Sequence, residues 1–336
     1  MVTRSTGRRP LKAIIPAAGS GTRLRPITST LPKALVQVAH QPILGHILEH
    51  VQASGISRAV LVISPEGRAI VDYAIKAFPQ MRFESVVQEH PRGLGHAVAL
   101  TRDVAEGSEL LIIYGDTIIE ADLKPVLATP ADGAIGVREV EDPSRFGVVL
   151  EGDGRITKLV EKPAEPISRR AIVGVNYIRD SVALYDALDY IMKEGVKTRG
   201  EYQLTDAFQR MLEVGRTLVS FTVEQWFDCG TAESLLETNR HLLTKMAHEP
   251  QGDESAFIPP VYVDASATVR HSVIGPNVTI GAGAAVENCV LRDCLIYEGA
   301  RLTNCNLAGS VIGYSAEVHW PPQQLVLGDY TTIDGG

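Results

Sequence analysis

KAIIPAAGSGTRLRPITSTLPK, residues 12–33, decides the expected fold, because it joins a buried strand to a loop suited to an anion. Ala13–Ile15 form a short apolar run closed by Pro16, which predicts a buried parallel strand. Small residues follow, so a ligand can approach the backbone, and successive N–H groups in such a turn form an anion-binding concavity. These small residues are Ala17, Ala18, Gly19, Ser20 and Gly21. Three cations come next, and we predict a triphosphate-binding loop: Arg23, Arg25 and Lys33.

Composition and charge limit the classes of function. A chain of 336 residues, 45% hydrophobic and 21% charged, is long enough for two globular domains. No run reaches the roughly 18 apolar residues of a membrane span, and no apolar signal core follows the basic first ten residues, so we expect a cytoplasmic protein. The four cysteines include no C-x-x-C pair, which predicts free thiols. A net charge of −8 argues against nucleic acid as the main partner.

Strand and helix patterns alternate along residues 11–247, which predicts a doubly wound, mostly parallel α/β sheet. Residues 1–10 are expected to be a flexible leader, and the polar, proline-rich residues 248–260 a linker. The expected helices span residues 42–54, 68–78, 94–104, 182–193, 203–214 and 231–247. The expected later strands span residues 59–64, 83–88, 110–114, 134–140, 146–151, 156–160, 172–178 and 217–223.

A repeat follows the linker. Apolar residues recur every five or six positions, giving turns of 17, 16 and 16 residues (263 to 280, 280 to 296 and 296 to 312). A three-sided coil with one inward apolar residue per side produces this rhythm, so residues 261–336 are predicted to be a short parallel β-helix with a C-terminal tail. The inward positions are Val263, Val269, Ile274, Ile280, Val286, Leu291, Ile296, Leu302, Leu307, Ile312 and Val318.

The opening motif fits neither the Walker loop nor the dinucleotide fingerprint. The string G-S-G-T-R-L-R-P at residues 19–26, followed by Lys33, instead closely resembles the G-x-G-T-R-L-x-P…K motif of the sugar nucleotidylyltransferases. Four further blocks follow in that family's order: Gln88 with Gly93-Leu94-Gly95, Tyr114-Gly115-Asp116, Glu161-Lys162-Pro163, and W-F-D-C-G at 226–230. The resemblance covers about residues 11–247 and implies a Rossmann-like nucleotidyltransferase domain. The repeat resembles the left-handed hexapeptide β-helix of the family's longer members.

Two aspartates are candidate metal ligands. Asp116 follows the apolar strand 110–114, and ligands of open parallel sheets bind beyond the carboxyl ends of strands. Hard carboxylate oxygens suit Mg²⁺. The resemblance implies that Asp116 and Asp228 both hold Mg²⁺, although Asp228 is also placed to cap the helix that follows it.

The resemblance also implies two substrate subsites. Lys162 would pair with the phosphate of a sugar 1-phosphate, and Glu161 would bind sugar hydroxyls. Further sugar-side positions are Gly147, Gly174, Asn176, Tyr177 and Arg199. The nucleotide-side positions are Ala17, Ala18, Gly19, Ser20, Gly21, Thr22, Arg23, Gln88 and Gly93. A glutamine amide has both a donor and an acceptor, so Gln88 can pair with the edge of uracil or thymine without distinguishing the two.

The implied reaction is direct displacement on the α-phosphorus of a nucleoside triphosphate by the sugar phosphate. Arg23, Lys33, Asp116 and Lys162 are the expected catalytic residues, with Mg²⁺, and Arg25 has no assignment. The resemblance favours dTTP or UTP with glucose 1-phosphate in a homo-oligomer. Guanylyl or adenylyl transfer onto mannose or glucose 1-phosphate is the alternative within the family.

Alternatives of other classes remain. Hexapeptide β-helices often serve acyltransferases that use a histidine, and His271 and His319 are available. A regulatory subunit without catalysis is a third class, although the intact cationic and acidic positions count against it. His46 and His50 match the zinc string H-x-x-E-H, but no third ligand is evident, so we interpret them as polar residues of a helix face.

Overall fold

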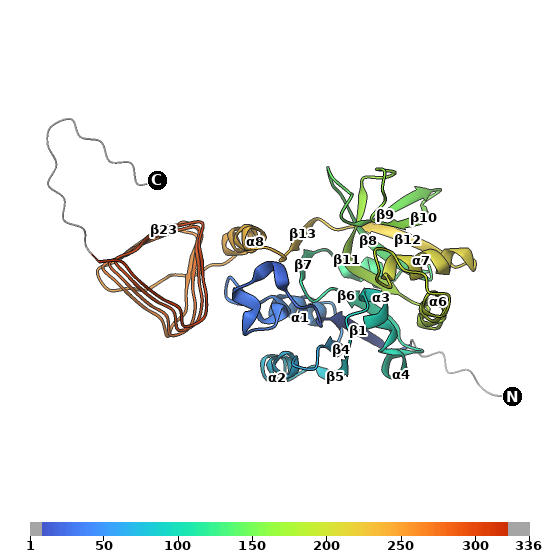
Figure 1. The fold of residues 1–336 in the computed structure, drawn as a ribbon, viewed down its shortest axis with the longest axis horizontal. Helices are drawn as coiled ribbons and strands as arrows, with labels where there is room; N and C mark the ends of the chain where they lie inside the picture. Colours follow the sequence, from blue (N-terminus) through green and yellow to red (C-terminus); the bar gives the residue numbers. More distant parts are fainter. Residues whose placement is uncertain (1–8, 322–336) are drawn as a thin grey trace. The chain divides into compact units, whose positions relative to one another are not determined.

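The computed structural model describes residues 9–321, which form two compact units (Figure 1). The first contains the chain up to Gln37 together with Gln41–Ser234, and the second contains Val38–His40 and the residues from Leu235 onward. Most of the predicted leader and tail, residues 1–8 and 322–336, lies outside the described residues. Within residues 9–321, no helix combines the length and the apolar character needed to cross a membrane.

A nine-stranded sheet organises the first unit, in the order β10-β9-β11-β6-β1-β4-β5, with β8 beside β11 and β12 beside β8. Strands β6, β1, β4 and β5 are parallel, as the predicted α/β fold class requires. The sheet as a whole is mixed, because β11 runs antiparallel to β6, β8 and β9. The strands are β1 Leu11–Pro16, β4 Arg58–Ile63, β5 Arg82–Val87, β6 Glu109–Ile113, β8 Gly133–Glu139, β9 Gly147–Gly152, β10 Arg155–Glu161, β11 Arg170–Ile178 and β12 Leu218–Thr222.

One antiparallel pair of the sheet, β9 with β10, has a local cause. Only Asp153 and Gly154 connect β9 to β10, and both have positive φ, 51° and 72°. Two such residues form the tight turn of a hairpin, which permits only antiparallel pairing. A helical crossover, by contrast, joins β1 to β4 and β4 to β5, so those strands stay parallel.

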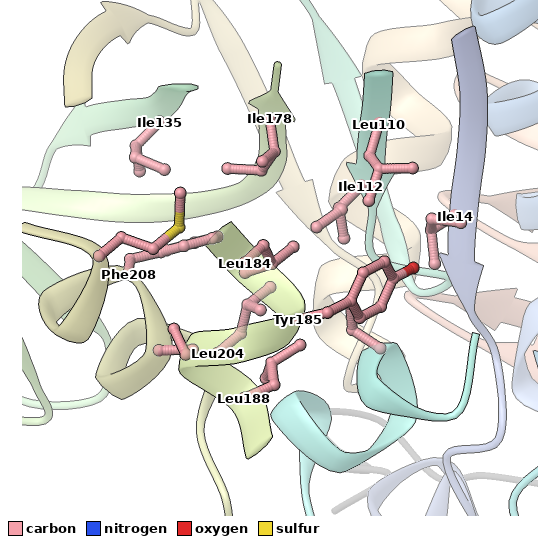
Figure 2. Packing of buried hydrophobic residues seen from close by; sticks show 14 of the residues in the cluster. Ile14, Leu110, Ile112, Ile135, Ile178, Leu184, Tyr185, Leu188, Leu204 and Phe208 are labelled. Atoms are coloured by element: carbon pink, nitrogen blue, oxygen red, sulfur yellow. The ribbon is translucent and has the colours of Figure 1, made fainter. Parts of the chain in front are cut away.

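Helices cover the sheet and close its core. Figure 2 shows Leu184, Tyr185 and Leu188 of α6 and Phe208 of α7 packed beside strand residues such as Ile112. All of these side chains are buried, and the Tyr185 hydroxyl is satisfied because it lies 2.7 Å from Thr101 Oγ1. The helices are α1 Ile43–Ala53, α2 Arg68–Ala77, α3 Leu94–Ala99, α4 Arg102–Ala105, α5 Leu123–Leu127, α6 Ser181–Lys193, α7 Leu204–Glu213 and α8 Ala232–Thr244.

The predicted helix at residues 94–104 is two helices, α3 and α4. The Thr101 side chain lies between them and donates to the carbonyl of Val98 at 2.7 Å. A threonine hydroxyl that bonds a nearby carbonyl competes with the helical ladder, and here it ends α3.

Smaller elements complete the first unit. Three 3-10 turns follow the opening loop, at Thr22–Leu24, Ile27–Ser29 and Lys33–Leu35. Strand β2 (Gln37–Val38) pairs with β3 (Gln41–Pro42), and β7 (Thr117–Glu120) pairs antiparallel with β13 (Gln225–Asp228). The sequence did not predict β7 and β13.

The second unit contains three sheets of short parallel strands, the three faces seen in Figure 1, and confirms the predicted β-helix fold. The apolar rhythm becomes exact register: Val263 pairs with Ile280, Ile280 with Ile296, and Ile296 with Ile312. The other inward positions form two equivalent rows, and the middle coils are fully buried. Left-handed residues at coil corners include Asn277, Asn288 and Asn304.

The strands of the β-helix are short. β14 (Ala256–Phe257) lies in the segment predicted to be a linker and pairs with β17, so coil-like pairing begins there. The other strands are β15 Val261–Val263, β16 Thr268–Arg270, β17 Val273–Ile274, β18 Val278–Ile280, β19 Ala285–Glu287, β20 Val290–Arg292, β21 Leu295–Ile296, β22 Arg301–Thr303, β23 Asn306–Ala308, β24 Val311–Ile312 and β25 Glu317–His319.

Candidate active site

The opening loop and the Asp116 loop meet because their strands are neighbours. β1 and β6 are parallel, so both carboxyl ends lie at the same edge of the sheet. Two bonds fix the loops there: Ala17 N donates to Val62 O at 2.7 Å, and Gly115 N donates to Pro16 O at 3.0 Å. A cavity of about 480 Å³ opens at this edge. Its lining includes Ala17, Ala18, Gly19, Ser20, Arg23, Lys33, Gln88, Gly93, Tyr114 and Asp116.

Both predicted metal ligands lie at one point of this edge. The antiparallel pairing of β13 with β7 sets Asp228 opposite Thr117, one residue after Asp116. Lys33 Nζ is 2.6 Å from Asp116 Oδ2 and 4.0 Å from Asp228 Oδ1. Lys33 is only 9% exposed, so its charge requires these partners.

The pair Asp116 and Asp228 fits the donor set of Mg²⁺. This ion usually binds through one or two protein carboxylates and takes its remaining oxygens from water and substrate phosphates. Both side chains are about a third exposed, with relative exposures of 39% and 33%, so phosphate oxygens can reach them. Among the described residues, no group of three or more His, Cys, Asp or Glu side chains gathers as a metal site.

Positive charge is concentrated beside the aspartates. A second cavity of about 270 Å³ is lined by Arg23, Arg145, Phe146, Lys162, Arg199 and Asp228. Four cations therefore face one carboxylate in a chain whose net charge is −8. This is the local concentration of cations that two phosphorylated substrates require.

A third cavity, of about 210 Å³, lies on the predicted sugar side and includes Gly147, Glu161, Lys162 and Thr205 in its lining. The Glu161 carboxylate is fixed there, because Thr205 Oγ1 donates to its Oε2 at 2.7 Å and Lys162 Nζ is 3.4 Å from its Oε1. Glycine at position 147 leaves room for this contact: a Cβ would lie 2.7 Å from Thr205 Oγ1 and 2.8 Å from Glu161 Oε2, so these side chains would have to shift.

Two of the predicted phosphate contacts have strained backbones. Lys162 and Arg199 both adopt positive φ, 43° and 52°. Such a conformation costs a non-glycine residue about 1 kcal/mol or more and persists where the surrounding structure enforces it.

The remaining sugar-side positions are on β11. Asn176 is fully buried, and Tyr177 is 1% exposed and pairs with Leu111 and Ala134 inside the central sheet. Burial, followed by the nearby Glu161 carboxylate, raises the pKa of Tyr114. Thr117 lies beside Gly174, and its Oγ1 donates a hydrogen bond to Asp116 Oδ1 at 3.3 Å. Contact of Gly174, Asn176 and Tyr177 with sugar stays a prediction.

The base-side residue Gln88 is 6% exposed and lines the large cavity. Its Nε2 lies 3.3 Å from Gly93 O and 3.0 Å from His96 Nδ1. Gly21 precedes the 3-10 turn in which Thr22 and Arg23 lie, and Thr28 Oγ1 donates to Gly21 O at 2.7 Å.

Sequence reasoning missed two lining residues, Arg145 and Phe146. Arg145 and Phe146 line the cavities of about 210 and 270 Å³. Leu94 and Tyr114 line the cavities of about 480 and 210 Å³. Phe146 packs edge-to-face on Trp226 of β13 at 4.9 Å, which supports the Arg145 loop. The available signal was the position of Arg145 immediately before the Phe146-Gly147 pair.

Other motifs lie elsewhere or serve local contacts. Glu49 of the zinc-like string accepts from Gln41 at 2.8 Å, and His46 Nδ1 is 3.3 Å from the same amide. His271 of the β-helix pairs with Glu254 at 3.0 Å, and both side chains are exposed. The contacts of His46 and Glu49 with Gln41 support the interpretation of these two residues as polar helix-face residues.

The family profile and the two similar sequences described below are all nucleotidyl transferases by name. The family profile described as "Nucleotidyl transferase" matches residues 12–245. Glucose-1-phosphate thymidylyltransferase of Streptomyces griseus is 33% identical over 96% of this chain and 98% of its own length. UTP–glucose-1-phosphate uridylyltransferase AglF of Haloferax volcanii is 30% identical over 69% of this chain and 96% of its own. A solved UDP-glucose pyrophosphorylase with UDP-glucose, at 23% identity and a TM-score of 0.61, shares the fold over 70% of this chain and 100% of its own.

Proposed function

The chain belongs to the nucleotidyl transferase family, and we propose that it transfers a nucleotidyl group from a nucleoside triphosphate to a sugar 1-phosphate. The products are a nucleoside diphosphate sugar and pyrophosphate. The full-length likeness to a glucose-1-phosphate thymidylyltransferase supports this reaction, and the regulatory and acyltransferase alternatives have no comparable support.

One observation carries the proposal. The cavity lined by Arg23, Arg145, Lys162, Arg199 and Asp228 contains residues from both predicted subsites. It therefore connects the loop assigned to the triphosphate with the loop assigned to the sugar phosphate. Two phosphorylated substrates can meet there without crossing an uncharged surface.

The cations of the site offset the main physical difficulty of the reaction, which is the repulsion between two anionic substrates. Two unit charges 4 Å apart repel by about 4 kcal/mol at an effective dielectric near 20, and several such pairs would prevent the encounter. We assign Arg23 and the amides of the opening loop to the β- and γ-phosphates, and Lys33 to the α-phosphate. Lys162 is assigned to the sugar phosphate, with Arg145 and Arg199 adding charge beside it.

The proposed step is an in-line displacement. An oxygen of the sugar phosphate forms a bond to the α-phosphorus while the bond from that phosphorus to the bridging oxygen breaks, and the electron pair leaves with pyrophosphate. The attacking oxygen is already an anion, so the residues need only orient and neutralise the substrates. Asp116 and Asp228 would hold Mg²⁺, which supplies charge neutralisation and alignment of phosphate oxygens when bound.

We favour dTTP or UTP with glucose 1-phosphate, because the names of the similar proteins described above refer to thymidylyl or uridylyl transfer to glucose 1-phosphate. Guanylyl and adenylyl transfer are the alternatives that the test must include. A homo-oligomer also remains a proposal, and light scattering of the purified chain measures it directly.

The test is pyrophosphate release with magnesium, using UTP, dTTP, CTP, GTP and ATP against glucose 1-phosphate, mannose 1-phosphate and an amino-sugar phosphate. We expect release with UTP or dTTP and glucose 1-phosphate, and none without a sugar phosphate. Acetyl-coenzyme A consumption, measured in the same wells, reports the acyltransferase alternative.

A further inference from the structure

We propose that His96 is a positioning residue that holds the Gln88 amide with its carbonyl oxygen toward the base. The site would then select bases that present a ring N–H at that edge, as uracil and thymine do, and reject cytosine. This inference rests on the proposed function and adds to it the chemical rule by which the base is chosen.

The orientation of the amide follows from its partners. One terminal atom of Gln88 lies 3.3 Å from Gly93 O. A backbone carbonyl can only accept, so that atom has to be the amide nitrogen Nε2. The same Nε2 is 3.0 Å from His96 Nδ1, which must therefore be the accepting nitrogen of a neutral ring that carries its proton on Nε2.

Neutrality of the ring has an independent physical basis. Burial lowers the pKa of His96, and the positive charge of Arg92 lowers it further. At neutral pH the ring is uncharged and Nδ1 keeps its lone pair. The acceptor that Gln88 needs is therefore present under ordinary conditions.

The second partner, Gly93, is held equally firmly. Its φ is 108°, and a Cβ at this position would lie 2.5 Å from Tyr202 O, so only glycine fits. Gly95 N donates to Tyr202 O at 2.8 Å, and Tyr202 N donates to Arg92 O at 2.9 Å. The carbonyl of Gly93 is thus fixed against the loop of residues 198–203.

The consequence concerns the face of Gln88 toward the cavity. Both hydrogens of Nε2 are directed to Gly93 O and His96 Nδ1, so Oε1 is the atom that remains for a ligand. Uracil and thymine offer N3–H to such an acceptor. Cytosine has a lone pair at the same ring position, and its binding would leave a buried acceptor unpaired.

The experiment compares UTP with CTP, which differ at this edge and hardly in size. Pyrophosphate release with glucose 1-phosphate and magnesium gives kcat/KM for each nucleotide in the full chain and its variants. His96→Leu removes the acceptor, and His96→Asn restores one, because its carbonyl oxygen lies near the position of Nδ1. Gln88→Leu removes the residue that reads the base.

We expect the wild type to prefer UTP, and His96→Leu to lower kcat/KM for UTP about tenfold with a smaller effect on CTP. His96→Asn should retain the preference for UTP. In the Gln88→Leu background, His96→Leu should cause no further loss, since His96 acts only through Gln88. His96→Ala removes the same acceptor and takes the place of His96→Leu if that chain does not fold.

Two results overturn the inference and separate it from the proposed function. An active wild type whose ratio of UTP to CTP is unchanged in His96→Leu contradicts the positioning role alone. An equal loss from His96→Leu with and without Gln88 does the same. No pyrophosphate from the wild type with any nucleotide would remove the proposed function, and this inference with it.

Discussion

The β-helix and the active-site edge of the first unit use buried residues in opposite ways. In the β-helix, inward positions such as Ile280 and Leu291 are apolar and fully buried, and each pairs with its equivalent in the next coil. At the active-site edge, the side chains of Lys33 and Glu161 are mostly buried, with 10% and 9% exposure, but carry charge. Burial of apolar side chains stabilises the fold. A buried charged side chain instead needs partners of opposite charge, and it can bind an ionic ligand.

Leu291→Ala should give the largest loss of stability. Leu291 is fully buried in the middle of the β-helix core, and such truncations cost about 2–5 kcal/mol through lost burial and a residual cavity. Thermal unfolding should show a lower midpoint for the β-helix transition. Pyrophosphate release per folded molecule should stay at the wild-type rate; a matching loss of kcat would mean that the two regions are not separable in this way.

Asp116→Asn should have the opposite effect and lower activity rather than stability. It removes one of the two carboxylates within 4.0 Å of Lys33 and one expected Mg²⁺ ligand, so kcat should fall about 10²–10³-fold. The matched control is Asp153→Asn, which changes an exposed aspartate in the β9–β10 turn and should leave kcat unchanged. Activity of Asp116→Asn within a few-fold of wild type would refute the role given to this carboxylate.

Arg145→Gln tests whether the residue that the sequence did not reveal takes part in binding. Loss of a charged contact to phosphate should raise KM for glucose 1-phosphate about tenfold, with a smaller change for the nucleotide. Arg155→Gln, at the exposed start of β10, removes the same charge outside these cavities. Equal effects of the two variants would mean that only the general field of the protein matters.

The smallest effect expected is a pH dependence of base choice. The pKa of His96 lies below 6.5 in the folded chain, so its proton binds more readily to the unfolded chain. The corresponding stability is present above pH 6.5 and is lost as pH falls through the lowered pKa. Protonated His96 cannot accept from Gln88, so the preference for UTP over CTP should decline by less than about tenfold over the same range. In His96→Asn the ratio should not vary; a wild-type ratio that is equally flat would contradict the assignment.

The β-helix could be predicted in detail because its signal is local. Each coil repeats after 16 or 17 residues, and the same residues that define the rhythm pair across coils, as with Ile274 and Leu291. The parallel half of the large sheet was predictable for a similar reason, since apolar strands alternate with helical segments. The antiparallel half was not, because the apolar pattern does not give strand direction, and the two-residue turn at Asp153 and Gly154 accounts for only one antiparallel pair, β9 with β10.

Individual residues of the site could be predicted from the sequence, but their proximity to one another in the fold could not. Asp116 stands at the end of an apolar strand, which identifies it from the sequence alone. Its contact with Lys33 joins residues 83 positions apart, and its proximity to Asp228 depends on the pairing of β7 with β13. Short strands such as these carry too few residues for a periodic pattern, so only the folded chain reveals the cluster.

The most direct test of the central claim is pyrophosphate release by the purified chain with magnesium, UTP or dTTP, and glucose 1-phosphate. We predict release that requires all three components and is lost in Asp116→Asn. No release from any of the five nucleoside triphosphates with any of the sugar phosphates would contradict the proposed function.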